Sequence, residues 1–143
     1  MKEVAVAPIR RSLFLAMGAA ALLELPALAA PVDGSVPLLC VSSRAFDCSS
    51  GTGCIEASAE GVNMADMLEV DVKAKKITAL DADIRGQTNA IAAVSHANGR
   101  LVISGVDGAR GWTLAIQEEG GHSVLTVSDS GIALILYGEC TAK

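Results

Sequence analysis

The sequence predicts an all-β domain: an antiparallel meander of about eight or nine short strands, rolled into a small barrel or sheet and stapled by disulfides. Three observations predict this fold. Apolar and polar residues alternate in several short segments, turn signals containing glycine separate those segments, and four cysteines follow an apparent export signal.

The turn signals recur at short intervals along the second half of the chain. They are Asn98-Gly99, Asp107-Gly108, Glu119-Gly120-Gly121 and Asp129-Ser130-Gly131. Asn-Gly and Asp-Gly suit two-residue hairpins, because such turns need positive φ at both central positions. Successive short hairpins predict that neighbouring strands in sequence are also neighbours in the sheet.

The segments between the turns have the period of two that is typical of strands. Leu68, Val70 and Val72 alternate with polar residues, and Trp112 starts a similar alternation that continues to Ile116. We expect strands near 38–45, 54–58, 67–72, 76–80, 89–95, 100–106, 110–117, 123–128 and 132–140. So many strands in so short a chain must curl. A short helical turn is expected within 58–67, and 31–37 is expected to be a loose leader.

Residues 1–29 are predicted to be a cleavable signal peptide, which leaves 30–143 as a single domain. Lys2, Arg10 and Arg11 supply a positive head, an apolar run covers 13–23, and Ala27-Leu28-Ala29 has the small residues of a cleavage site. The alternatives are an N-terminal membrane anchor or a buried helix. The run is well short of the ~20 residues that a spanning helix needs. We expect cleavage near Ala29, no membrane span afterwards, and a periplasmic or secreted bacterial protein.

Two export routes fit this head. The pair Arg10-Arg11 is similar to a twin-arginine signal. That route exports folded chains, and disulfides rarely form in the cytosol, so the four cysteines favour the ordinary secretory route.

Charge and composition bear on the choice of partner. The whole chain has a formal net charge of −5. Residues 1–29 hold three basic and two acidic residues, so their removal leaves −6. A phosphate backbone would repel such a chain, and an aromatic content of 3% disfavours platforms for stacked bases. We expect no nucleic-acid partner and a monomer.

The cysteines are Cys40, Cys48, Cys54 and Cys140. An even number in a small exported domain predicts two disulfides, for which three pairings are possible. Cys48–Cys54 with Cys40–Cys140 is favoured, because a flexible Ser/Gly turn lies between Cys48 and Cys54. The alternative is a zinc site, but the spacing is poor and an oxidising compartment disfavours it.

Several stretches of the chain resemble one group of proteins. They are Leu39-Cys40, Ala45-Phe46-Asp47-Cys48, Gly53-Cys54, Leu68-Glu69-Val70-Asp71-Val72-Lys73, Ile103-Ser104-Gly105-Val106, Gly111-Trp112-Thr113-Leu114 and Tyr137-Gly138-Glu139-Cys140. Together they resemble small, exported, four-cysteine bacterial proteins of unassigned function. The resemblance supports the architecture and implies no activity and no site residue.

The sequence carries no catalytic motif, and no catalytic residue, metal or cofactor is predicted. His96 and His122 could be metal ligands or a general base, but their places beside turns favour ordinary solvated side chains. The stretch from Asp81 to Gly86 partly matches a calcium loop. Arg85 stands there where an oxygen ligand is needed, so an EF-hand is rejected.

Trp112 is the main candidate for a ligand pocket. It is expected in the core of the sheet or at the lining of a pocket, with Phe46 or Tyr137 nearby. The leading hypothesis is therefore a non-enzymatic exported binding domain for a small apolar ligand or a protein surface. The alternatives are a structural or envelope accessory protein without a pocket, and a small hydrolase that uses dispersed carboxylates and a histidine.

Overall fold

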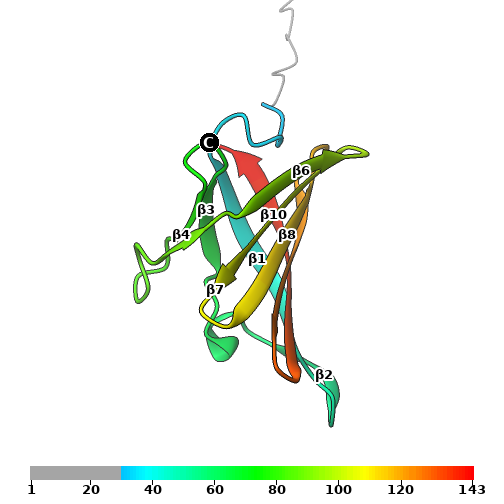
Figure 1. Ribbon diagram of the computed structural model, residues 1–143. Helices are drawn as coiled ribbons and strands as arrows, with labels where there is room; N and C mark the ends of the chain where they lie inside the picture. The colour runs from blue at the N-terminus through cyan, green and yellow to red at the C-terminus, as the bar shows by residue number, and fades with distance from the viewer. Residues whose placement is uncertain (1–29) are drawn as a thin grey trace, which may run out of the picture.

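The computed structural model describes residues 30–143. The predicted signal peptide and its cleavage site lie outside these residues. The described chain is all-β, and its ten antiparallel strands form one curled sheet in the shape of a half-barrel (Figure 1). The predicted fold class is confirmed. Within the described residues no helix has both the length and the apolar character needed to cross a membrane.

The strands follow the predicted order closely. They are β1 (Leu38–Ser49), β2 (Gly53–Ala57), β3 (Met67–Asp71), β4 (Lys76–Ala79), β5 (Thr88–Ala90), β6 (Ala93–Ala97), β7 (Arg100–Asp107), β8 (Arg110–Gln117), β9 (His122–Asp129) and β10 (Ile132–Ala142). The short helical turn is η1 (Glu60–Val62). The strand expected near 89–95 is divided into β5 and β6, and the first strand runs further than predicted.

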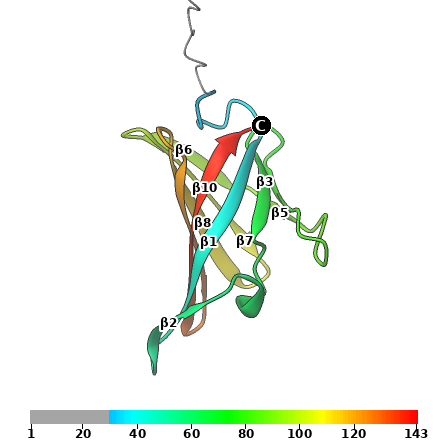
Figure 2. The same ribbon diagram turned by 180° about the vertical axis from the view of Figure 1, so that it is seen from behind.

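The first and last strands lie side by side in the middle of the sheet. The order is β5-β4-β3-β1-β10-β9-β8-β7-β6, and β2 pairs with β1 as a side hairpin that projects from one end (Figures 1 and 2). Cys40 and Cys140 are directly opposite each other in the β1–β10 pair and form a disulfide. The bridge therefore fastens the two ends of the chain across one pair of strands.

The two outer strands of this order are successive segments of one chain stretch. β5 pairs with β4, whereas β6 pairs with β7. Between them, the Ile91 amide donates to the Lys75 carbonyl at 2.9 Å and the Ala92 amide donates to the Ser104 carbonyl at 2.8 Å. Successive amides of an extended chain point to opposite sides, so this stretch bonds to the residue before β4 on one side and to β7 on the other.

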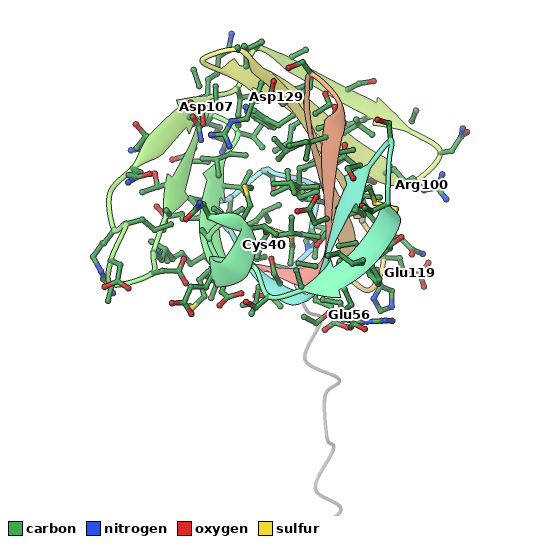
Figure 3. All side chains as sticks on the ribbon, turned by 90° about the horizontal axis from the view of Figure 1, so that it is seen from below. Cys40, Glu56, Arg100, Asp107, Glu119 and Asp129 are labelled. Atoms are coloured by element: carbon green, nitrogen blue, oxygen red, sulfur yellow. A yellow bond between two sulfur atoms is a disulfide. The ribbon has the colours of Figure 1, made fainter. Side chains whose placement is uncertain are left out.

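One hydrophobic core fills the inside of the curl, as the view along the sheet shows (Figure 3). Leu101 and Ile103 on β7 are fully buried, and Leu114 and Ile116 face them from β8. These are alternate positions, because successive side chains of a strand point to opposite faces. The period of two in the sequence thus predicts which face of β7 and β8 is buried.

A β-bulge changes the alternation in the middle of β1. Leu38 and Cys40 are buried, and the register with β10 shifts between Ser42 and Arg44. After this extra residue the odd-numbered Ala45 is buried, so Phe46 lies on the outer face.

The segment before β1 is not the loose leader that the sequence predicts. Val32 is only 8% exposed and belongs to the core. Gly34 has a φ of +75°, and a Cβ there would lie 2.7 Å from Cγ2 of Val72. The segment lies at the end of the sheet opposite the β1–β2 hairpin (Figure 1). Val32 and Val36 are the only large apolar residues of this segment and only Val32 is buried, so the sequence gives no periodic signal there.

Candidate functional site

A small pocket of about 120 Å³ lies beside η1 and the β7–β8 turn. These two elements lie at the same end of the sheet (Figure 1). Its wall is apolar and is formed by inward side chains of four strands: Leu68, Ile77, Trp112, Leu125 and Val127. Its rim is polar and consists of Asn63, Gln87, Asn89, Asp107 and Arg110. An apolar interior with a few polar groups at the entrance is typical of small-molecule sites.

The strand registers bring the wall together. Trp112 on β8 lies opposite Val127 on β9, and Leu114 lies opposite Leu125 two residues further along. Leu68 and Ile77 come from β3 and β4, across the inside of the curl. Short residues, including Ala65 and Ala79, line the same space and leave it unfilled.

Among the buried side-chain nitrogen and oxygen atoms of residues 30–143, the indole Nε1 of Trp112 is the one without a hydrogen-bond partner. Trp112 is 7% exposed, and its Nε1 atom makes no hydrogen bond to any part of the chain that the structure describes. Buried tryptophan N–H groups usually find an acceptor. A buried donor left without one costs about 1–3 kcal/mol. This donor therefore belongs to a residue of the pocket wall but is itself closed to solvent, with its bonding capacity unused.

Gly105 allows the indole to occupy this position. It faces Trp112 across the β7–β8 pair, and a Cβ at Gly105 would stand 2.7 Å from Cε2 of the ring and 2.5 Å from the Ala90 carbonyl oxygen. Gly105 is not among the site residues that the sequence predicts. The signal was present, because a glycine inside a strand often marks a close approach of another group.

The charged part of the rim is internally neutralised. Asp107 ends β7 and Arg110 starts β8, so the two residues are opposite each other across the hairpin turn. Their side chains form an ion pair with an N–O distance of 3.1 Å. The entrance therefore presents a balanced pair beside neutral amides and not a net charge.

Phe46 and Tyr137 lie away from this pocket. Their rings stack edge to face on the outer surface of β1 and β10, with centroids 6.0 Å apart, and Arg44 lies 5.1 Å above the Phe46 ring. Tyr137 is 45% exposed. The structure therefore does not bring either ring to Trp112. The bulge in β1 is the reason for Phe46, because it reverses which residues face outward.

The four cysteines form Cys40–Cys140 and Cys48–Cys54, the pairing favoured from the sequence. Cys40–Cys140 is buried in the core, whereas Cys48–Cys54 joins the strands of the projecting β1–β2 hairpin. Residues 30–143 contain no free cysteine. Two disulfides indicate an oxidising, exported compartment.

Both histidines contact a carboxylate, at the end of the sheet opposite the pocket. Nδ1 of His96 lies 2.8 Å from Oε1 of Glu118, and Nδ1 of His122 lies 3.4 Å from Oε1 of Glu139. Each histidine side chain is more than half exposed. Ion pairs in water typically contribute less than about 1 kcal/mol to stability. The pKa of a general base is normally adjusted by burial, and these exposed pairs lack that feature.

The calcium-like stretch has a structural use. Asp81 accepts a hydrogen bond from the Met67 amide at 3.2 Å and so holds the start of β3. In the described part of the chain, His, Cys, Asp and Glu side chains do not gather in threes as a metal site would require.

Comparisons with protein-family models, with curated proteins and with solved structures find no match to this chain. The candidate site therefore depends on its geometry alone.

Proposed function

We propose that this domain is a non-enzymatic exported binding protein that holds one small, mainly apolar ligand in the pocket beside Trp112. The observation that carries the proposal is the buried indole with an unpaired N–H in an apolar wall. A packed core normally satisfies such a group. A binding site, in contrast, often keeps a polar group for its ligand.

The volume sets the size of the ligand. The pocket measures about 120 Å³. An apolar cavity of about 150 Å³ accepts benzene, so the space inside this smaller pocket suits a molecule of at most about six non-hydrogen atoms. A larger ligand would need to extend over the rim, past Asn63, Gln87 and Asn89.

The electrostatics favour a neutral ligand. Asp107 already neutralises Arg110, and the domain as a whole is acidic. An anion would meet this overall negative charge. The one acidic residue that lines the pocket is Asp107, and its charge is already paired with Arg110, so the rim does not favour a cation either.

The export of the domain is part of the same proposal. We infer that residues 1–29 are a signal removed near Ala29 and that the ordinary secretory route delivers the chain to the periplasm or beyond. The two disulfides support an oxidising destination. We also propose that the chain is related to the small exported four-cysteine proteins that it resembles.

A second candidate is binding of a protein surface, with no ligand in the pocket. It is favoured by the outward pair of Phe46 and Tyr137 rings on β1 and β10. Apolar side chains gathered on a surface can mark an interface. The hydrolase hypothesis needs a histidine beside a carboxylate in a pocket. The two histidine–carboxylate pairs are exposed and lie at the end of the sheet opposite the pocket, so they do not favour it.

A fluorescence titration tests the proposal, because Trp112 is the single tryptophan of the chain. Compact neutral compounds should change its emission in a saturable way. Ala79 lines the pocket, so Ala79→Leu should fill it and abolish the change. Ala115 lies on the outer face of β8, and Ala115→Leu should bind as the wild type does. Equal responses in all three proteins would place binding elsewhere.

A further inference from the structure

We infer that the Trp112 N–H selects the ligand, so that the pocket prefers a compact neutral molecule with one hydrogen-bond acceptor, such as a ketone or ether oxygen, over a hydrocarbon of the same shape. This inference rests on the proposed binding function. It goes further by naming the chemical group that the site recognises and the atom that recognises it.

The first step is the chemistry of the donor. An indole N–H can only donate, and no acceptor within residues 30–143 receives its hydrogen. A bound oxygen would supply the missing acceptor. A hydrocarbon would fill the same volume and leave the donor unsatisfied. The bond should therefore discriminate between two ligands that have equal apolar contacts.

The second step concerns access to the N–H. Trp112 lines the pocket, but its Nε1 atom is closed to solvent in this conformation. Contact with a ligand therefore requires a small rotation of the ring or a shift of its neighbours. The edge of the indole that includes Cε2, the atom bonded to Nε1, faces Gly105, which has no side chain, and the pocket lies beside the same residue.

The third step excludes a charged acceptor. A carboxylate bound beside Trp112 would need a free cation at the rim. Arg110 is the only arginine or lysine in the lining, and Asp107 accepts a hydrogen bond from its guanidinium at 3.1 Å. A neutral oxygen needs no counter-charge, so it suits the indole N–H better.

The test compares cyclopentanone with methylenecyclopentane, in which a CH₂ group replaces the carbonyl oxygen. The two compounds differ in hydration, so their affinities cannot be compared directly. We therefore measure the ratio of the two affinities in the wild type and compare it with the same ratio in Trp112→Phe. Removal of the N–H should lower the ketone's advantage about three- to tenfold, which is the worth of one neutral hydrogen bond. Wild-type affinities follow from Trp112 fluorescence, and those of both proteins from methyl resonances of the pocket in NMR spectra.

A second readout needs no variant. With one tryptophan in the chain, an ¹⁵N–¹H spectrum contains one indole resonance. Cyclopentanone should move that proton downfield as a hydrogen bond forms, and methylenecyclopentane should not. If both compounds bind and the resonance and the affinity ratio are unchanged, the inference is overturned and the proposed function stands. If neither compound binds, the proposed function itself fails for this ligand class.

Discussion

Gly105 and Trp112 face each other across the β7–β8 pair, and a Cβ added to Gly105 would stand 2.7 Å from Cε2 of the indole and closer still to Cζ2. The backbone of Gly105 does not have positive φ, so the conformation itself tolerates a side chain. Only the space is missing. The position of the indole, and with it the pocket wall, thus depends on one absent methyl group.

Gly105→Ala should displace the indole. Inserting a methyl group into a packed site costs about 1–3 kcal/mol of unfolding free energy. Trp112 should also become more exposed, so its emission should move to longer wavelength. Urea unfolding monitored by fluorescence measures both effects. Gly111→Ala is the matched control on the next strand, where a Cβ would make an ordinary contact 3.5 Å from Oγ of Ser128. Equal losses in the two variants would show that packing against Trp112 is not the cause.

The two disulfides should stabilise the domain unequally. Cys40–Cys140 joins residues 100 apart in sequence, whereas Cys48–Cys54 joins residues six apart. Restriction of the unfolded chain predicts a loss of about 4–5 kcal/mol for the first bridge and roughly 2 kcal/mol for the second. Paired Cys→Ser variants and urea unfolding measure the two losses. A larger loss for the hairpin bridge would contradict this account.

Val32 should contribute to stability although it lies in a segment without secondary structure. It is buried against the core, so Val32→Ser should cost about 1–2 kcal/mol by loss of apolar burial. Val36 is 36% exposed, and Val36→Ser should stay within about 0.5 kcal/mol of the wild type. Thermal unfolding compares the two variants. Identical midpoints would mean that the segment does not close this end of the sheet in solution.

Glu56 should titrate below its ordinary pKa. Its carboxylate accepts a hydrogen bond from Arg44 at 3.0 Å, and this bond with the positive charge lowers the Glu56 pKa below 4.5. A lowered pKa in the folded state gives stability that is present above the unfolded-state value. That stability is lost as the pH falls through the folded-state value.

The ¹³C resonance of the Glu56 carboxyl group reports this pKa directly. We expect a midpoint under 4.5 in the wild type and a return to about the ordinary value in Arg44→Gln. Both side chains are exposed, so added salt should reduce the difference. An unchanged midpoint in Arg44→Gln would show that the pair does not form in solution.

Most of the fold could be predicted from the sequence because its signals are local. Alternation predicts the buried face of β7 and β8, and Asn98-Gly99 has the two positive φ angles that its turn requires. The pairing of β1 with β10 is not local. It follows from the Cys40–Cys140 bridge that the spacing favours. The bulge at Ser42 to Arg44 could not be predicted, because one extra residue leaves no compositional trace.

The site was less predictable than the fold. Trp112 begins an alternating segment, and this places it on an inward face. The neighbours of Trp112 in the pocket come from strands far apart in the sequence, including Leu68 and Leu125, and no local pattern joins them. The Asp107–Arg110 pair could be recognised only once the turn between them was fixed. The unpaired indole N–H depends on three-dimensional packing throughout.

Native mass spectrometry can test whether the pocket beside Trp112 holds a ligand. The protein is purified under mild conditions from the cells that make it. We expect the wild-type protein and Ala115→Leu to carry the added mass of one small neutral molecule, which denaturation releases. We expect Ala79→Leu to carry no added mass. A bare mass for the wild type, or the same added mass on Ala79→Leu, would contradict the claim that this pocket holds a ligand.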